Sequence, residues 1–405
     1  MMDKALVCSG KERCMLTKRN IKNGDELSIL GFGCMRLPSD EDEAIRLIRT
    51  AIEKGVNYFD TAYIYKAGRN EVVLGNALSG VYRERVKIAT KLPPYMVNSL
   101  DAAKKIFATQ LARLQTSYID YYLIHMLTDK PMFDKMVSLG VMEWLEKERE
   151  EGTIKNIGFS FHGSKQDFEL IVKAYPWEFC QIQYNYLDEN NQATKSGLIL
   201  AHEIGIPVIV MEPLRGGRLV NNLPDKVVTS FKSYDKERTA AEWALRWIWN
   251  HKEVTVILSG MNSLEQLNEN VRIANDARPD SLSADELNIF DEVRDIMINK
   301  TKVPCTGCGY CMPCPYGVNI PACFTSLNDK YLLHDKNSRW KYIQTLGGFS
   351  AETAFASKCK ECGKCEKHCP QDIEIRKQLK IVKKEMEGIL FKPFISIARR
   401  ALRIK

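Results

Sequence analysis

The sequence predicts an α/β fold in two parts: a (β/α)₈ barrel, followed by a small, mainly α-helical domain rich in cysteine. Two observations predict it. Short apolar runs alternate with amphipathic stretches from about residue 30 to residue 258, and eight of the thirteen cysteines lie in the segments 305–314 and 359–369. Alternating strands and helices are typical of a parallel sheet, and eight such units in about 250 residues favour a closed barrel.

Eight apolar runs are the predicted strands. In chain order they are ILGFGCM (29–35), VNYFD (56–60), VKIAT (86–90), IDYYLIH (119–125), IKNIGFS (154–160), FCQIQYN (179–185), IPVIVME (206–212) and VTVIL (254–258). A doubly wound open sheet is the alternative, and it would require a Gly-x-Gly-x-x-Gly motif after the first strand. The sequence there is GFGCMR, which lacks the third glycine, so we expect the barrel.

Amphipathic helices are predicted between the strands and after them. In the segment 42–55, one stripe of the helix carries Ile45, Ile48, Ala51 and Ile52. A helix at 280–300, with Ser283 as its N-cap, ends the barrel part. We therefore expect a barrel domain at 1–300, the cysteine-rich domain at 301–375 and a basic amphipathic tail at 376–405.

The cysteine spacing predicts two [4Fe–4S] clusters. The second segment has the spacing C-x₂-C-x₂-C-x₃-C-P of bacterial two-cluster ferredoxins, and the first segment matches it except that its last gap is one residue shorter. In such ferredoxins the fourth cysteine of each run binds the other cluster. The predicted ligand sets are Cys305, Cys308, Cys311 and Cys369 for one cluster, and Cys359, Cys362, Cys365 and Cys314 for the other.

Two alternatives remain for these cysteines. Sites of four thiolates also suit zinc, although zinc ribbons separate two Cys-x₂-Cys pairs by a longer loop. The clusters could also have a purely structural role, but one cluster would then suffice, whereas an electron relay needs two neighbouring clusters. The arrangement favours a ferredoxin-like domain that transfers electrons.

Composition limits the cellular setting and the partners. The N-terminal segment shows no secretory signal and no stretch is apolar enough to span a membrane, so we expect a cytoplasmic protein with reduced thiols. The net charge is +7, and the last thirty residues hold ten Lys or Arg against two Glu. No base-reading module accompanies this charge, so we expect no nucleic-acid partner. The tail could contact an anionic membrane peripherally, dock a redox partner or pack against the barrel.

Four polar residues follow the predicted strands at one end of the barrel. Asp60 ends the second strand with Tyr65 just beyond it, Lys91 ends the third and His125 the fourth. Active sites of such barrels lie at the carboxyl ends of the strands. Carbonyl reduction needs a proton for the developing alkoxide, and a phenol with a pKa of about 10 is a slow acid at neutral pH. Lys91 could lower that pKa, Asp60 could hold Lys91, and His125 could orient the carbonyl or assist proton transfer.

These motifs resemble the aldo-keto reductase family over residues 16–300. The matching stretches are GFGCMRLP, FDTAYIY, TK, LIH, GFS, QIQYN and EPLRGGRL, in the family's order. The resemblance implies a TIM barrel, a nicotinamide cofactor at the carboxyl face, and Asp60, Tyr65, Lys91 and His125 as the catalytic tetrad. The whole chain is similar to the branch of the family that carries a C-terminal ferredoxin-like domain with two [4Fe–4S] clusters.

The resemblance also implies cofactor contacts. Ser160 and Gln181 match positions that hold the nicotinamide carboxamide, Gly216 and Gly217 match the loop near the pyrophosphate, and Asn270 matches the adenine contact. Two positions depart from the family, since Phe161 replaces the usual asparagine and Met211 the tyrosine that stacks on the nicotinamide. Gly260 and Gln266 replace the cations of NADPH-specific members. NAD(H) is therefore favoured over NADP(H), unless Arg215 or Arg218 supplies the charge.

The sequence thus predicts an oxidoreductase that interconverts a small carbonyl compound and an alcohol, coupled to one-electron transfer through the clusters. Because a nicotinamide carries electron pairs and a cluster single electrons, an FMN in the barrel mouth is a further hypothesis. One alternative is an electron-transfer module that links NADH or a flavin to a ferredoxin- or flavodoxin-type partner without carbonyl chemistry. Another is a regulatory subunit that senses nucleotides.

Overall fold

The structure is a computed structural model of the whole chain, and it describes residues 15–221, 223–332, 337–348 and 352–388 together with residues 391, 393 and 395. The chain divides into two compact units. The first comprises Met1–Leu214 and Ala241–Ser283, and the second comprises Arg215–Ala240 and Ala284–Lys405. Each unit is a separate packed body with its own core, and the domain boundaries near residues 300 and 375 stay predictions.

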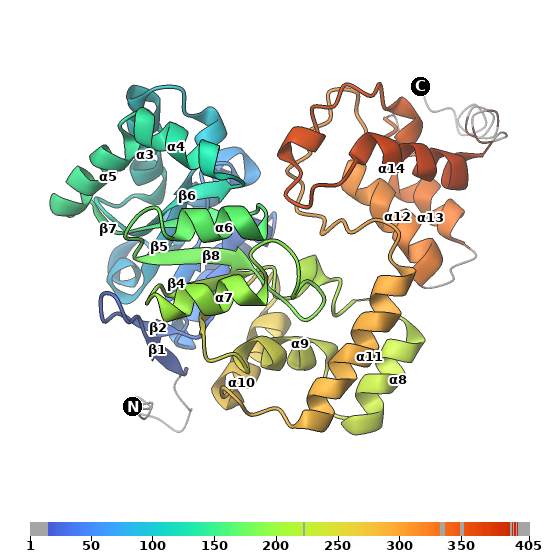
Figure 1. Cartoon of the computed structure of the whole chain (residues 1–405), viewed down its shortest axis with the longest axis horizontal. Coiled ribbons are helices and arrows are strands. Elements are labelled where there is room, and N and C mark those ends of the chain that lie inside the picture. Colours follow the sequence, from blue (N-terminus) through green and yellow to red (C-terminus); the bar gives the residue numbers. More distant parts are fainter. Residues whose placement is uncertain are drawn as a thin grey trace. The chain divides into compact units, whose positions relative to one another are not determined.

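The first unit is built on a closed barrel of eight parallel strands, as the sequence predicts (Figure 1). Each strand pairs with the next one along the chain, and β10 pairs with β3 to close the barrel. Every predicted apolar run therefore contains a strand. The strands are β3 (Leu30–Gly33), β4 (Tyr58–Asp60), β5 (Lys87–Leu92), β6 (Ile119–Leu127), β7 (Ile154–Phe161), β8 (Phe179–Gln183), β9 (Val208–Met211) and β10 (Val254–Ser259).

Burial on both faces explains why the strands are nearly continuous apolar runs. All nine residues of β6 are buried. Aromatic rings fill part of the core, with Tyr58 and Tyr121 in an edge contact at 5.2 Å between ring centroids and Tyr121 and Phe179 at 5.0 Å. The interior is therefore a packed core, and chemistry is confined to the ends of the barrel.

Helices surround the barrel and bury one face each against it. The first of them begins at the N-cap Asp40, whose carboxylate accepts a hydrogen bond from the Glu43 N–H. Its buried stripe comprises Ala44, Leu47, Ile48, Ala51 and Ile52, whereas the predicted Ile45 is only half-buried. The helices of this unit are α1 (Glu41–Glu53), α2 (Arg69–Ala77), α3 (Leu100–Leu114), α4 (Lys130–Ser138), α5 (Val141–Glu150), α6 (Lys165–Val172), α7 (Thr194–Glu203), α9 (Ala240–Trp249) and α10 (Leu264–Asp276).

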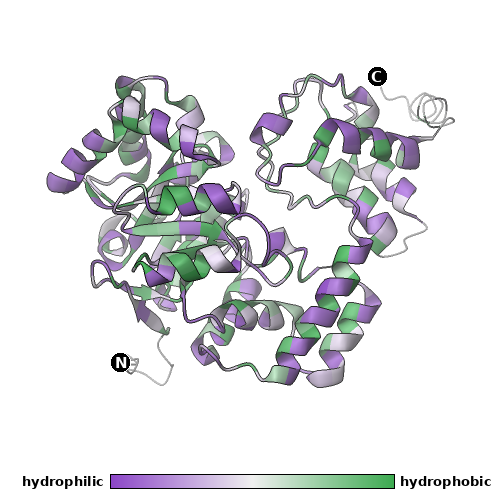
Figure 2. Ribbon diagram, viewed as in Figure 1, coloured by the Kyte–Doolittle hydropathy of each residue, from purple (hydrophilic) through white to green (hydrophobic). Residues whose placement is uncertain are grey.

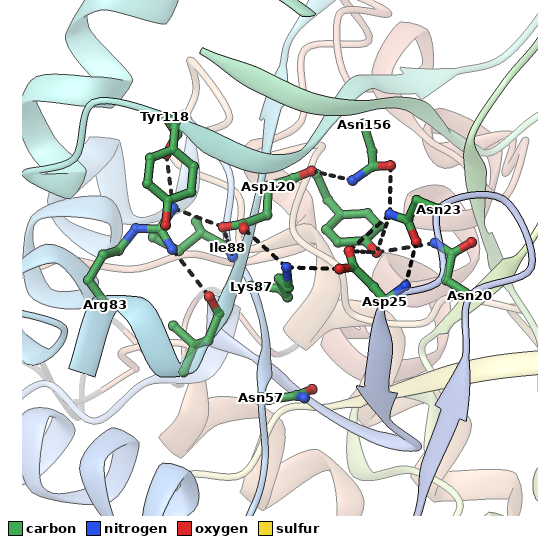
Figure 3. A network of polar contacts seen from close by, with 12 residues as sticks. Asn20, Asn23, Asp25, Asn57, Arg83, Lys87, Ile88, Tyr118, Asp120 and Asn156 are labelled. Carbon is green, nitrogen blue, oxygen red and sulfur yellow. Dashed lines mark hydrogen bonds and ion pairs between the residues drawn. The ribbon is translucent and has the colours of Figure 1, made fainter. Parts of the chain in front are cut away.

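A short antiparallel hairpin, β1 (Thr17–Arg19) and β2 (Glu26–Ser28), closes the amino-terminal end of the barrel. Figure 3 shows the polar network that fastens it. Lys87, the first residue of β5, lies 2.9 Å from Asp25 and 3.8 Å from Asp120, and Arg83 lies 2.8 Å from Asp120. These ion pairs fasten the hairpin to the first residues of β5 and β6.

The second unit is mainly α-helical, as predicted for the cysteine-rich part. Its buried core includes Val303, Phe324, Leu327, Tyr342 and Leu379, with several cysteines packed against it. The helices are α8 (Asp225–Tyr234), α11 (Ala284–Lys300), α12 (Ile320–Leu332), α13 (Ser338–Thr345) and α14 (Ile375–Val382), which continues into a π-helical turn, Lys383–Glu387. Helix α11 begins directly after Ser283, the predicted N-cap.

Helices α8 and α11 pack against each other inside the second unit. Phe231 and Phe290 meet with ring centroids 6.0 Å apart, and the Ser230 hydroxyl donates a 2.9 Å hydrogen bond to Glu292. Figure 2 shows hydrophilic and hydrophobic stretches alternating along both helices. The segment Arg215–Ala240, which the sequence places among the barrel elements, thus packs with the cysteine-rich part.

Part of the basic tail packs on its own unit. Phe391 and Ile395 belong to the buried core, and the Phe391 ring lies 4.8 Å from that of Phe355. Apart from residues 391, 393 and 395, the tail after Gly388 lies outside the described part, so membrane contact through the tail stays a prediction. Among the described residues, no helix combines the length and apolarity needed to cross a bilayer.

Candidate active site and candidate metal centres

The predicted catalytic side chains lie at the carboxyl ends of neighbouring strands. Asp60 is the last residue of β4, Lys91 the last but one of β5, and His125 lies near the end of β6. Tyr65 begins the short helical turn Tyr65–Gly68 that follows β4. Parallel pairing of β4 with β5 and of β5 with β6 brings the ends together. The fold therefore gathers all four residues at one end of the barrel.

Lys91 and Asp60 form a buried ion pair. The Lys91 ammonium lies 2.6 Å from the Asp60 carboxylate and donates another 2.6 Å hydrogen bond to the Thr61 carbonyl. Their exposed fractions are 0% for Lys91 and 3% for Asp60. Burial acts to lower the pKa of Lys91, but the carboxylate of Asp60 and the nearby Tyr65 outweigh burial and raise it. Lys91 is therefore a fixed cation at neutral pH.

Tyr65 lies between this cation and His125. The Lys91 ammonium is 5.2 Å from the centroid of the Tyr65 ring, and the Tyr65 and His125 rings meet edge to face with centroids 6.1 Å apart. The turn that holds Tyr65 is strained, because Lys66 and Ala67 have φ of 47° and 54°. Lys66 holds it by donating a 2.6 Å hydrogen bond to the Leu37 carbonyl.

His125 is positioned by an irregularity in β6. The pairing with β7 shifts register between Ile124 and Leu127, and Met126 has φ of 53°. The Ser160 hydroxyl accepts a 2.7 Å hydrogen bond from the Met126 N–H and so holds the bulge. Burial, with Lys91 and His162 adding to it, lowers the pKa of His125 well below its ordinary value. The imidazole is therefore neutral at neutral pH.

A buried hydrogen-bond network around Glu71 lies next to the site and was not predicted from the sequence. The Glu71 carboxylate accepts hydrogen bonds of 2.7 Å from Thr90, 3.0 Å from Gln110 and 3.1 Å from Arg113. Arg113 also donates to the Tyr63 carbonyl at 3.2 Å, and Gln110 to the Lys91 carbonyl at 3.1 Å. The network thus joins the turn before Tyr65 to the strand that carries Lys91. A buried glutamate in an amphipathic helix gives no sequence signal of its own.

Two further residues lie near the site without having been predicted. Cys34, in the turn after β3, is fully buried, and burial followed by the charge of Asp60 raises the pKa of its thiol. Tyr95, in the turn after β5, is 41% exposed, and burial followed by the nearby Tyr65 raises its pKa. Cys34 therefore packs near the ion pair as a neutral thiol, and Tyr95 is a partly exposed phenol near Tyr65.

The second unit contains a cavity of about 350 Å³ among the cysteines. Cys314 from the first segment lines it together with Cys359, Cys362 and Cys365 from the second. These are the four residues predicted to share one cluster. Cys311, which is predicted to bind the other cluster, lines the cavity as well. The rest of the wall combines apolar residues such as Pro313 and Ile320 with the basic Lys360, Lys364 and Arg376. Four thiols around a cavity of this size fit a [4Fe–4S] cluster.

The other four cysteines also lie near one another. Burial raises the pKa of the Cys311 thiol, and the neighbouring thiols of Cys308, Cys305 and Cys369 raise it further. The crossing, in which each segment supplies its last cysteine to the other cluster, stays a prediction. Within the described ranges, no three His, Cys, Asp or Glu side chains are gathered as they would be around a single metal ion.

The two cysteine segments have the same local backbone. The N–H of Gly307 points to the Cys305 sulfur at 3.4 Å, and the N–H of Glu361 points to the Cys359 sulfur at the same distance. Both residues have positive φ, 73° for Gly307 and 56° for Glu361. Turns of this kind direct N–H groups at ligand sulfurs, and such contacts adjust the reduction potential of a cluster.

Two arginines from the segment after β9 contact the first cysteine segment within the second unit. Arg218 donates a 2.7 Å hydrogen bond to the Cys305 carbonyl and another to the Thr325 hydroxyl. Arg215 is 5% exposed and donates to the Pro304 carbonyl at 3.3 Å. From the sequence, these arginines were candidates for binding a nucleotide phosphate. In the structure, their guanidinium groups instead donate hydrogen bonds to backbone carbonyls of the iron–sulfur part.

Comparison with known protein families agrees with this geometry. Residues 29–295 match the aldo/keto reductase family, and residues 304–374 match the 4Fe-4S dicluster domain. The chain belongs to the aldo/keto reductase family. This aldo/keto reductase is an oxidoreductase with a C-terminal iron–sulfur domain, as the sequence predicted.

Curated relatives share the barrel part. The chain is 29% identical over 290 residues to "Probable aldo-keto reductase 1" of Glycine max, a match that covers 61% of this chain and 81% of the relative. It is 28% identical over 293 residues to "Uncharacterized oxidoreductase YqkF" of Bacillus subtilis, covering 65% of this chain and 92% of the relative. Both alignments leave a large share of this aldo/keto reductase without a counterpart.

Solved structures show the same fold. The holo form of the aldo-keto reductase AKR11C1 from Bacillus halodurans superposes with a TM-score of 0.59 at 28% identity, covering 69% of this chain and 96% of that chain. An aldo/keto reductase from Klebsiella pneumoniae in complex with NADP and acetate gives a TM-score of 0.57 at 24% identity, with 68% and 94% covered. The second likeness concerns the fold alone.

The positions where the aldo/keto reductase family holds the nicotinamide amide lie side by side. Ser160 on β7 pairs in register with Gln181 on β8. The Gln181 side chain is 1% exposed, and its carbonyl oxygen has no hydrogen-bond partner among the described residues. Its amide nitrogen lies 3.5 Å from the Met211 sulfur. Phe161 is buried and contacts the Phe168 ring of α6 at 5.2 Å. An unsatisfied buried acceptor at Gln181 fits a carboxamide donor.

Some of the residues expected to bind the adenosine part of the nicotinamide cofactor form contacts with other residues of the chain. The Asn270 amide donates a 2.9 Å hydrogen bond to the Ser259 hydroxyl and is 4% exposed. At Gly260 a side chain would come within 3.8 Å of the Arg36 guanidinium, which forms no ion pair within the described ranges. Gly216 and Gly217, with φ of 68° and 89°, lie in a turn that belongs to the second unit. Arg36 is thus the cation beside Gly260, and the sequence did not indicate it.

Proposed function

We propose that the barrel interconverts a small carbonyl compound and an alcohol, with Tyr65 as the residue that donates or accepts the proton. The observation that carries this proposal is the buried Lys91–Asp60 pair, with the Lys91 ammonium 5.2 Å from the centroid of the Tyr65 ring. A cation beside a phenol favours the phenolate and so makes the hydroxyl a better acid. General acid catalysis by a positioned side chain contributes about 10²–10⁴-fold to rate.

The remaining two members of the tetrad have positioning roles. Asp60 holds the Lys91 ammonium at 2.6 Å and keeps it charged in a buried place. The neutral His125 can form a hydrogen bond with the carbonyl oxygen without competing with Tyr65 as a proton donor, because its pKa is lowered by burial and by Lys91. The substrate is a small aldehyde or ketone, or the matching alcohol.

Nicotinamide is the proposed hydride carrier of the barrel. When bound, it supplies or removes the hydride while this chain supplies the proton. Gln181, whose buried carbonyl oxygen lacks a partner among the described residues, would hold the carboxamide together with Ser160. Asn270 remains the proposed contact to the adenine, and the assignment of Gly216 and Gly217 to the pyrophosphate stays a prediction from the resemblance.

NAD(H) is the proposed form of the cofactor. The guanidinium groups of Arg215 and Arg218 donate hydrogen bonds to the carbonyls of Pro304 and Cys305. Arg36 beside Gly260 is then the cation on which binding of a 2′-phosphate would depend. Dissociation constants of NADH and NADPH for the wild type and for Arg36→Met test this. A wild-type preference for NADPH that Arg36→Met removes would contradict the NAD(H) assignment.

The two clusters are proposed to pass single electrons between the barrel chemistry and a protein acceptor or donor. The cavity lined by Cys314, Cys359, Cys362 and Cys365 supports one of them. An FMN in the barrel mouth would connect two-electron and one-electron chemistry. These cofactors are tested by purifying the protein anaerobically and quantifying iron, sulfide, flavin and nucleotide in one sample. A sample that contains zinc in place of iron would overturn the proposed electron transfer through the clusters.

The variant Tyr65→Phe tests the carbonyl chemistry. Small aldehydes and ketones are assayed with NADH under anaerobic conditions, and kcat/KM is expected to fall by about 10²–10⁴-fold while NADH binding and cluster content stay at wild-type level. Tyr82→Phe, on the far surface turn Gly80–Arg85, is the matched control. Wild-type turnover by Tyr65→Phe would exclude Tyr65 as the acid.

A second candidate function is electron transfer without carbonyl chemistry. It is favoured by Phe161, whose ring is buried against Phe168 where the family has an asparagine. The same variant separates the two functions. If no carbonyl compound is turned over and NADH still bleaches the clusters of both wild type and Tyr65→Phe, the electron-transfer module is correct.

A further inference from the structure

The two cysteine segments differ in charge and exposure although their spacing is nearly the same. The first segment, CTGCGYCMPC, contains no charged residue, and Cys305 is 8% exposed. The second, CKECGKCEKHC, contains Lys360, Lys364 and Lys367, and its Cys362 is exposed. The cluster space lined by Cys362 therefore reaches the surface at a charged place.

The acidic residues of the second segment do not compensate this charge. Glu361 lies 2.7 Å from Lys380, and Glu366 lies 2.7 Å from Arg376. Each glutamate is thus paired with a cation from outside the segment. Lys360, Lys364 and Lys367 are exposed and form no ion pair within the part of the chain that the structure describes. We call these three lysines the basic collar.

Two lysines of the basic collar line the cluster cavity, and the third lies in a neighbouring turn. Lys360 and Lys364 line the cavity together with Cys359, Cys362 and Cys365, and Lys367 lies in the turn between Cys365 and Cys369. Electron transfer needs a partner's redox group close to the cluster, and charge of one sign around the transfer point guides a partner of the opposite sign. Charge and redox access therefore coincide on one surface.

We propose that the basic collar docks an acidic one-electron carrier protein, which exchanges electrons with the cluster held by Cys314, Cys359, Cys362 and Cys365. This inference rests on the proposed electron relay. One electron leaves the reduced cluster and enters the carrier's redox group, and in a flavin carrier a proton from water accompanies it. The partner is recognised by its negative surface, and the three lysines set the rate of encounter.

The test uses the full-length protein with its clusters, reduced by dithionite and freed from excess reductant, and mixed with oxidised flavodoxin as the acidic carrier. Flavodoxin reduced by one electron differs in colour from the clusters, so stopped-flow absorbance gives the rate. The triple variant Lys360→Glu, Lys364→Glu and Lys367→Glu is expected to slow this rate by about 10–100-fold at low ionic strength. The difference should largely vanish near 1 M salt, where the screening length is about 3 Å.

Two controls make the result specific. The variant Lys22→Glu, Lys104→Glu and Lys105→Glu changes the net charge equally at exposed lysines of the first unit, and it should react with flavodoxin at the wild-type rate. With cytochrome c, a basic acceptor, the collar variant should react faster than the wild type. Equal rates for the collar variant and the wild type with flavodoxin, in samples of equal cluster content, would overturn the docking surface.

If the proposed function is wrong but the docking surface is right, the experiment gives a different set of rates. Because dithionite supplies the electrons, the flavodoxin reaction does not need NADH or carbonyl turnover. Clusters that transfer electrons to flavodoxin but are never reduced by NADH would contradict the relay and leave the docking surface intact. Loss of binding to anionic vesicles in the collar variant, with an unchanged flavodoxin rate, would show that the collar serves a membrane and would overturn the proposal.

Discussion

The guanidinium group of Arg218 donates a 2.7 Å hydrogen bond to the backbone carbonyl of Cys305, a residue 87 positions further along the chain. The contact places a permanent cation next to a proposed cluster ligand. Reduction adds negative charge to a cluster, and a nearby cation favours the reduced form. We therefore expect Arg218 to raise the reduction potential of the cluster that we assign to Cys305.

Replacing Arg218 should lower that potential. For Arg218→Gln we expect a decrease on the order of tens of millivolts, measured by redox titration followed by electron paramagnetic resonance. Arg218→Lys keeps the charge and should stay close to wild type. Arg339→Gln is the matched control, because Arg339 also donates to a backbone carbonyl of the same unit, that of Glu385. A shift shared by Arg218→Gln and Arg339→Gln would speak against a specific effect.

Substitution of the crossing cysteines should reveal which cluster each one binds. The spectrum of Cys369→Ser should match that of Cys308→Ser, and the spectrum of Cys314→Ser should match that of Cys362→Ser, because each pair removes a ligand of the same cluster. Low-temperature electron paramagnetic resonance of the dithionite-reduced proteins provides the comparison. If Cys314→Ser instead resembles Cys308→Ser, each segment binds its own cluster.

Breaking the Lys91–Asp60 pair should destabilise the barrel. Lys91→Met leaves the Asp60 carboxylate buried and uncompensated, which costs about 3–5 kcal/mol in the free energy of unfolding. The double variant Asp60→Asn with Lys91→Met removes both charges and should recover most of this loss in urea denaturation. It should not recover carbonyl turnover, since the cation beside Tyr65 is still missing. Equal stability of the single and double variants would mean that the pair is not coupled.

His162 should make the free energy of unfolding depend on pH. Burial lowers its pKa from 6.5 to about 4, partly opposed by its hydrogen bond with Gln192. When the pH falls below 6.5, His162 binds a proton in the unfolded chain but stays neutral in the folded chain. The free energy of unfolding therefore decreases between pH 6.5 and about pH 4, by at most about 3 kcal/mol. His162→Gln should flatten this dependence relative to wild type in parallel urea titrations.

A side chain at Gly68 should displace the Arg113 guanidinium, because a Cβ there would overlap it. Gly68→Ala has two effects: the cost of alanine at φ of 88° and displacement of Arg113 from Glu71 and the Tyr63 carbonyl. Gly80→Ala is the matched control, since its φ is 70° and nothing lies within 4 Å of the added atom. Gly80→Ala should cost about 1–2 kcal/mol, and Gly68→Ala should cost more and also lower kcat. Equal effects would mean that Arg113 yields without consequence.

The sequence predicted the parts of the site that follow local rules. Asp60, Lys91 and His125 end recognisable strands, and parallel strands end on one side, so their meeting could be expected. The cysteine spacings likewise carry their own geometry. Glu71 and Arg113 could not be found in this way, because each is an ordinary charged residue in a helix and only the fold brings them together.

Other features depend on contacts between distant segments. The hairpin of β1 and β2 has three residues in each strand, too few for an alternating pattern to stand out. In the helix predicted within 42–55, Ile48, Ala51 and Ile52 are buried as expected, whereas Ile45 is half-buried and Ala44 and Leu47 are buried as well. The position of the barrel, which the helix sequence alone does not contain, decides which residues at the edge of the stripe are covered.

The segment Arg215–Ala240 has a consequence for how the iron–sulfur part could be isolated. The chain passes from one unit to the other at Leu214, returns at Ala241 and leaves again at Ala284. The segment lies within residues 29–295, the part that matches the aldo/keto reductase family, yet it packs with the iron–sulfur part. Cutting the chain near residue 300 to isolate the iron–sulfur part would therefore remove helices α8 and α11, and we expect the isolated part to be less stable than the same part in the full chain.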